Sequence, residues 1–187
     1  ADNSEAWYHK GAALYRLDRS EEAVECFDNA LELAPDHYKA WVGKGSALAK
    51  EGEHVAAVEC FDKATQLTPN NTDAWMSRGI VHMKTGAMLN YAIMCFDEVL
   101  KHEENNLEAM ENKVEALLLS KKADDAAVLL ERMIAVAPAN EAYKKKLAEL
   151  SPDDLDNVTA KLKKNPKDPG LWRKRAELLA AAGNTAE

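Results

Sequence analysis

A tryptophan returns at a fixed interval in the first half of the chain, and this period limits the possible folds more than any other feature. Trp7, Trp41 and Trp75 are each 34 residues apart, and a glycine follows each of them by four residues. A fixed period of about 20 to 50 residues is typical of repeat proteins, in which one small supersecondary unit is stacked several times. The sequence therefore predicts a repeat architecture.

The second part of each unit recurs with the same period and explains what the unit is. Small residues at spacings of three and four allow two helices to cross closely, aromatic rings fill the space around the crossing, and a proline ends the second helix. One hairpin of two helices cannot bury its apolar side alone, so the units have to stack. We predict an all-α stack of antiparallel helix hairpins. The recurring positions are Ala23, Phe27, Ala30 and Pro35, then Ala57, Phe61, Ala64 and Pro69.

This order of Trp, Gly, Ala, Phe, Ala and Pro resembles the tetratricopeptide repeat family, strongly from residue 4 to about residue 138 and weakly beyond. The resemblance implies a right-handed α-solenoid in which the first helices of the hairpins line a concave face. One departure is clear, because the family's usual leucine before the glycine is replaced by a cation. The replacing residues are Lys10, Lys44, Arg78 and Lys113.

We predict a single solenoid domain over residues 1–187. Repeats are expected at about 4–37, 38–71, 72–106 and 107–138, followed by a short degenerate repeat at 139–166 and a single terminal helix at 168–184. That last helix is interpreted either as a solvating cap or as the point where a longer array is cut. At the helix starts, Asp36, Thr72 and Ser20 are the expected N-cap residues.

Residue types that perform catalysis or bind metals do not cluster in this sequence. The five histidines form no H-E-x-x-H motif, and no two cysteines form a C-x-x-C pair. We therefore predict no enzyme, no metal site and no cofactor. Instead, Cys26, Cys60 and Cys95 recur once per repeat, which predicts small buried residues. Free thiols suit a reducing compartment, so the expected location is cytoplasmic.

Charge and hydropathy exclude two further classes of partner. The net charge is −8, which argues against a nucleic-acid partner, since such binding needs many cations facing phosphates. No stretch approaches the roughly 20 apolar residues of a membrane-spanning helix. We therefore expect neither nucleic acid nor a membrane as a partner. His82 falls in an inward-facing position that Leu14, Leu48 and Leu117 hold in the other repeats, and is predicted to be a buried histidine.

The family resemblance places the groove-facing positions one, five and eight residues after each tryptophan, on one helical face. Most of these positions are apolar, which favours protein recognition over simple solvation. We predict a scaffold for protein–protein interaction that binds a peptide or helix of a partner in the concave groove. The alternative is that some of these residues pack between repeats. The predicted groove residues are Tyr8, Tyr15, Val42, Ser46, Met76, Ile80, Met83, Glu111 and Glu115.

Three further interpretations accompany this one. The main alternative function is self-assembly into a homo-oligomer, through the exposed ends of the stack or the helix around Trp172. Binding of chaperone tails is disfavoured, because the positions that hold the carboxylate in such family members are here Tyr8, Ala12, Gly43, Asp73 and Ser77. The cations before the glycines, and a second row at Arg16, Lys50 and Lys84, either lie solvated beside acidic neighbours or bind an acidic partner.

Overall fold

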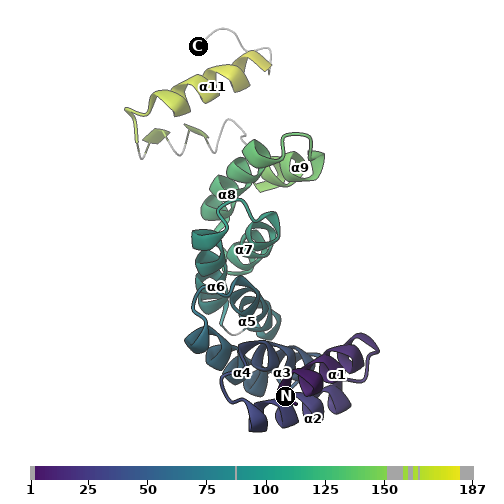
Figure 1. The fold of residues 1–187 in the computed structure, drawn as a ribbon. Coiled ribbons are helices and arrows are strands. Elements are labelled where there is room, and N and C mark those ends of the chain that lie inside the picture. Colours follow the sequence, from purple (N-terminus) through teal and green to yellow (C-terminus); the bar gives the residue numbers. More distant parts are fainter. Residues whose placement is uncertain (1–2, 87, 151–157, 160–161, 164, 182–187) are drawn as a thin grey trace. The chain divides into compact units, whose positions relative to one another are not determined.

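Figure 1 shows the protein as a computed structural model, which describes residues 3–86, 88–150, 158–159, 162–163 and 165–181. They belong to two compact units, Ala1–Ala126 and Ala127–Glu187. Over the described ranges the regular structure is helical, without a strand. The prediction of an all-α solenoid of stacked antiparallel hairpins is confirmed. The prediction of one domain over all 187 residues stays a prediction.

The first unit contains consecutive helix hairpins. Each helix packs against the next in the chain, and each first helix also contacts the first helix of the following hairpin. The hairpins therefore form two layers, with α1, α3, α5 and α7 in one and α2, α4 and α6 in the other (Figure 1). The helices are α1 (Ser4–Arg16), α2 (Ser20–Leu33), α3 (Tyr38–Lys50), α4 (His54–Leu67), α5 (Thr72–Thr85), α6 (Leu89–His102) and α7 (Leu107–Leu119).

The remaining helices are α8 (Ala123–Val136), which begins in the first unit and ends in the second, and then α9 (Glu141–Leu150) and α11 (Pro169–Ala181). The terminal helix predicted at 168–184 matches α11 as far as residue 181, and its last three positions lie outside the described residues. Most of the second helix expected in the short repeat, between residues 151 and 164, also lies outside them.

The glycine in each of the first three repeats makes room for a phenylalanine ring. A Cβ atom added at Gly11 would lie 2.9 Å from Phe27, and one added at Gly45 would lie 2.8 Å from Phe61. The third repeat is built the same way. These rings are buried to 1 % exposure or less, so each ring fills the crossing between the two helices of its own hairpin. This close approach is why glycine and phenylalanine recur together in the sequence.

All three N-cap predictions differ by one residue from the observed caps. The N-cap of α3 is His37 rather than Asp36, since its Nδ1 atom accepts a hydrogen bond from the Ala40 amide at 3.4 Å. The N-cap of α5 is Asn71 rather than Thr72, and its Oδ1 atom accepts from the Ala74 amide at 2.8 Å. Ser20 is wrong as a cap because it is already inside α2, buried and without a hydrogen bond to its hydroxyl.

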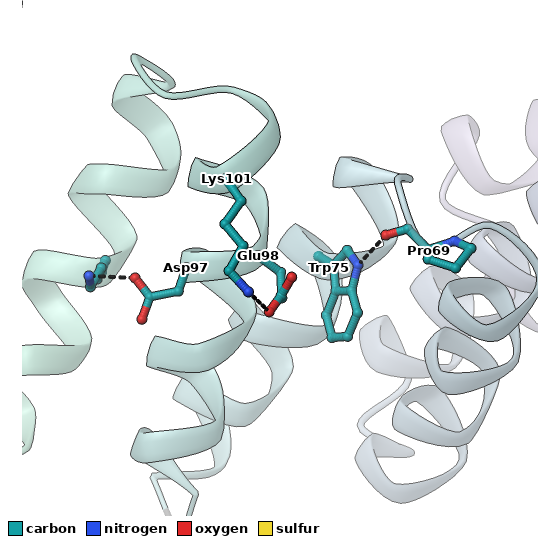
Figure 2. A network of polar contacts seen from close by, with 6 residues as sticks. Pro69, Trp75, Asp97, Glu98 and Lys101 are labelled. Atoms are coloured by element: carbon teal, nitrogen blue, oxygen red, sulfur yellow. Dashed lines mark hydrogen bonds and ion pairs between the residues drawn. The ribbon is translucent and has the colours of Figure 1, made fainter.

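Two kinds of polar contact connect consecutive repeats in the first unit. The Trp75 indole donates a hydrogen bond to the Pro69 carbonyl at 2.8 Å (Figure 2), and Trp41 does the same to Pro35 at 2.8 Å. Three of the four cations in the row before the glycines, all except Lys10, make an ion pair with an aspartate in the preceding second helix. These pairs confirm the interpretation of acidic neighbours for those three cations. The pairs are Lys44–Asp28 at 2.5 Å, Arg78–Asp62 at 2.9 Å and Lys113–Asp97 at 2.6 Å.

We expect Trp75→Phe to lower the free energy of unfolding by about 1 to 2 kcal/mol. The variant loses the indole hydrogen bond, worth about 1 kcal/mol, and weakens the stacking of Arg78, whose guanidinium lies 5.5 Å from the ring centroid. Trp7→Phe is the matched control. Lys10 lies 4.9 Å above the Trp7 ring, but Trp7 donates to no proline carbonyl in the part of the chain that the structure describes. Equal losses for both variants in urea denaturation would contradict a role for the hydrogen bond.

Candidate partner-binding groove

The first-helix layer carries a depression of about 410 Å³ between α1, α3 and the start of α5. Four of the predicted groove residues line it, namely Tyr8, Tyr15, Val42 and Ser46. The first two come from α1 and the other two from α3, so the contact of these two helices brings them together. The full lining is Tyr8, Ala12, Tyr15, Arg16, Phe27, Tyr38, Lys39, Val42, Gly43, Ser46, Asn71 and Asp73.

The floor of this depression is apolar, and its walls combine aromatic rings with charged and polar side chains. A Cβ atom at Gly43 would lie 2.5 Å from Cζ of Phe27, so this ring occupies the space where a side chain would otherwise stand. The Tyr8 ring packs on Phe27 with 6.1 Å between centroids. Ser46 donates its hydroxyl hydrogen to the Val42 carbonyl at 2.9 Å, which leaves its oxygen as an acceptor. The floor therefore suits an apolar side chain of a ligand, and the charged and polar side chains of the walls can contact its polar groups.

The predicted residues of the third repeat are placed differently. Met76, Ile80 and Met83 on α5 are partly buried and pack against a cluster made by Ala92, Phe96 and Ala116 of α6 and α7. None of these three lines the depression. They therefore have a packing role between repeats, as the alternative interpretation expects, and their role in binding stays a prediction.

The predicted residues of the fourth repeat, Glu111 and Glu115, are exposed on α7. They do not line the depression either, which the structure confines to α1, α2, α3 and the start of α5. Their role in binding likewise stays a prediction.

Charge is separated along the first-helix layer. Acidic residues occupy the first turns of α1, α5 and α7, as Glu5, Asp73 and Glu108. The last turns of α1, α3 and α5 instead carry Arg16, Lys50 and Lys84. This arrangement complements the helix dipoles. It also places these acidic side chains at one edge of the layer, interrupted by Lys39 of α3, and the three cations at the other edge, where Asp18 pairs with Lys50.

Lys50 has the most contacts of these cations. Its Nζ atom lies 5.0 Å from the centroid of the Tyr15 ring and forms an ion pair with Asp18. The hydrogen bond between the two charged groups raises the pKa of Lys50 and lowers the pKa of Asp18. Both groups therefore stay charged near neutral pH.

The three cysteine side chains are buried, and their thiols are unreactive at neutral pH. Burial raises the pKa of Cys60 and of Cys95 to about 11, and it also raises the pKa of Cys26. The thiolate is the nucleophile, so these protonated thiols are poor nucleophiles at neutral pH.

Among the described residues, no group of three or more His, Cys, Asp or Glu side chains could hold a metal ion. The helices that the structure describes include none long and apolar enough to cross a membrane.

Sequence reasoning missed part of the depression, namely Tyr38, Lys39, Gly43, Asn71 and Asp73, together with the floor ring of Phe27. One signal was available in the sequence. Gly43 is an additional glycine two residues before the repeat's own Gly45, whereas the same position is Ser77 and Asn112 in the next two repeats. The loss of a side chain on a surface-facing helix marks a place of close approach.

The family model for the tetratricopeptide repeat matches residues 8–72. No curated protein matches the chain. Among solved structures, MamA from Desulfovibrio magneticus RS-1, residues 41 to the end, is 19% identical with a TM-score of 0.73, over 97% of this chain and 97% of that one. TTC0263, a thermophilic tetratricopeptide repeat protein of Thermus thermophilus, is 21% identical with a TM-score of 0.62, over 95% and 99%.

A third similar structure holds a ligand. The first tetratricopeptide repeat domain of Spaghetti (RPAP3), bound to the HSP90 peptide SRMEEVD, is 21% identical with a TM-score of 0.59, over 61% of this chain and 90% of that one. At such identities the similarity of these structures shows the fold.

Proposed function

Because the chain belongs to the tetratricopeptide repeat family, we propose that it is a scaffold for protein–protein interaction whose first-helix layer binds a peptide or helix of a partner. The observation that carries this proposal is the depression between α1 and α3. It combines an apolar floor at Phe27 and Gly43 with walls that include Tyr8 and Tyr15. An aromatic-lined hollow of this size on a surface layer favours recognition of a ligand over solvation.

The peptide-bound neighbour supports peptide binding by this fold but not the same ligand. In that structure a similar fold holds the acidic peptide SRMEEVD. In this chain, however, the positions that hold a terminal carboxylate in such family members include Ala12, Gly43 and Asp73, which offer no cation. We therefore propose binding of a peptide or helix without a clamp for its terminal carboxylate.

Photochemical cross-linking tests the proposal with a matched pair of tyrosines. We place p-benzoylphenylalanine at Tyr15, which lines the depression, or at Tyr91, which is 51% exposed on α6 in the second-helix layer. Both changes keep an aromatic ring, so neither should disturb the fold. In extract of the source cells, irradiation is expected to give a discrete adduct from Tyr15 and none from Tyr91.

Two other outcomes would reject the proposal. Adducts from Tyr91 alone would place the binding surface on the opposite layer. An adduct from Tyr15 whose mass equals two copies of this chain would favour self-assembly. Circular dichroism and light scattering of both substituted proteins establish that each retains its fold and size before the comparison is made.

A further inference from the structure

The structure separates the two rows of cations that the sequence contains. In the row before the glycines, Lys44, Arg78 and Lys113 make ion pairs with aspartates of the preceding repeat. The row at the ends of the first helices is different. Within the described part of the chain, Arg16 and Lys84 form no ion pair and are exposed, whereas Lys50 is paired with Asp18. This row therefore has cationic groups available to a ligand.

An apolar strip runs beside this row. The residue that precedes each cation in the chain is Tyr15, Ala49 or Met83, and each is partly buried against a core cluster. In the first repeat the remaining exposed surface lies next to the cations, because Tyr15 and Arg16 line the same depression and the Nζ atom of Lys50 lies 5.0 Å from the centroid of the Tyr15 ring. We call these six positions, three cations and three apolar residues, the basic edge.

We propose that the basic edge binds an extended acidic segment of a partner protein, which crosses α1, α3 and α5 with a carboxylate at every third residue. This inference rests on the proposed function and gives the chemistry of the partner. The two outer carboxylates face the unpaired Arg16 and Lys84, and the middle one replaces Asp18 on Lys50. Apolar side chains of the same segment lie on Tyr15, Ala49 and Met83.

The spacing of the helices sets the spacing of the carboxylates. The first helices contact one another in sequence, α1 with α3 and α3 with α5. Axes of packed helices are about 8 to 10 Å apart. A chain in the polyproline II conformation has about three residues per turn with a rise of about 3.1 Å each, so one face returns after about 9 Å. Acidic residues at positions i, i+3 and i+6 therefore meet the three cations in register.

The charges around the basic edge favour a sparsely acidic peptide over a densely charged polyanion. The whole chain has a net charge of −8, and Asp18 and Glu51 lie beside the cations in sequence. A densely charged polyanion would meet these acidic groups as well as the cations. A peptide with one carboxylate per turn meets the cations while placing uncharged residues between them. A regular, sparse acidic pattern is thus the charge distribution that complements this surface.

The test uses a fluorescein-labelled probe of three Glu-Leu-Pro triplets, in which every third residue is acidic. The control peptide has the same composition, but its three glutamates are contiguous. Fluorescence polarisation at low salt is expected to show binding of the triplet probe at least about tenfold tighter than binding of the control. Affinity should fall as salt is added, because the interaction is between exposed charges.

Matched variants assign this binding to the basic edge. Arg16→Glu combined with Lys84→Glu should weaken the probe at least about tenfold. Lys63→Glu combined with Lys121→Glu changes the net charge equally at exposed positions elsewhere, and should weaken it much less. If both double variants lose the same affinity for the probe, net charge alone explains the binding, and the inference is overturned. Equal binding of the two peptides, or a Kd weaker than about 1 mM for the probe, would overturn it as well.

Two competing ligands complete the test. Tighter binding of oligothymidylate, lost in the Arg16→Glu/Lys84→Glu variant, would assign the edge to nucleic acid. Tighter binding of a helical peptide with glutamates seven residues apart would overturn the extended conformation.

The cross-linking experiment at Tyr15 is independent of these probes. If Tyr15 captures a partner while the triplet probe fails, the proposed function stands and this inference falls.

Discussion

Phe61→Ala is expected to lower the free energy of unfolding by about 3 to 5 kcal/mol. The Phe61 side chain is 1% exposed, and its ring lies where a Cβ of Gly45 would stand. Its truncation removes a large apolar side chain from the centre of the first unit. The backbone around it is held by the crossing of α3 and α4, so the cavity cannot fully collapse. Urea denaturation followed by circular dichroism measures the loss.

The same variant should also reduce the cooperativity of unfolding. Phe61 forms one buried cluster with Ala57 and with Val81 of α5, so it connects its own hairpin to the next. In repeat proteins each unit is stabilised mainly by its neighbours. Tryptophan fluorescence and circular dichroism should then give non-coincident transitions in the variant, which is the sign of a populated intermediate.

Val55→Ala on the same helix α4 is the matched control, because Val55 is 78% exposed. It should change stability by no more than about 0.5 kcal/mol. A loss below about 1 kcal/mol for Phe61→Ala would contradict the role we give to the ring, since it would mean that the surrounding helices close the cavity without cost.

The fold could be predicted from the sequence because the same packing contacts recur in each repeat and require the same residue types at the same spacing. Trp41 and Trp75 bond the carbonyls of Pro35 and Pro69, so even the distance from proline to tryptophan is fixed by a contact. The caps were harder to place. Asp36 and His37 are both possible acceptors, and which of them bonds the Ala40 amide depends on how the turn is oriented, which no local pattern determines.

The candidate groove could be predicted only in part, for a physical reason. Tyr8 and Met76 occupy the same position in their repeats, and only Tyr8 lines the depression. The difference comes from the following repeat. At Gly43 the Phe27 ring takes the place of a Cβ atom and no side chain extends toward α1, whereas the Asn112 side chain donates a hydrogen bond to the Met76 sulfur at 3.9 Å. Groove residues thus depend on a neighbour about 35 positions away as well as on their own periodicity.

His82→Leu is expected to stabilise the protein by about 1 to 3 kcal/mol at neutral pH. The His82 side chain is 6% exposed, and its Nε2 atom has no hydrogen-bond partner. A buried polar group without a partner costs about 1 to 3 kcal/mol, and leucine removes that cost. The position tolerates leucine, since Leu14 and Leu117 are buried at the equivalent points of other repeats.

The pH dependence provides the sharper test of the same residue. Burial lowers the pKa of His82 below its ordinary value of 6.5, the nearby charge of Arg78 lowers it further, and Asp62 opposes the shift. The unfolded chain therefore takes up a proton near pH 6.5, whereas the folded protein takes it up only at lower pH. Protonation of His82 therefore favours the unfolded chain. Its effect on the free energy of unfolding is absent above about pH 6.5, and the protein loses stability as the pH falls from there toward the pKa of His82 in the folded state.

In unfolding experiments between about pH 7.5 and pH 5, His82→Leu should consequently lose less stability on acidification than the unmodified protein. His102→Leu is the control, because His102 is exposed at the end of α6 and should leave the slope unchanged. Parallel curves for the unmodified protein and His82→Leu would show that His82 is protonated equally in both states. In that case a water or a partner would have to satisfy its ring in solution, and burial would not disfavour its charge.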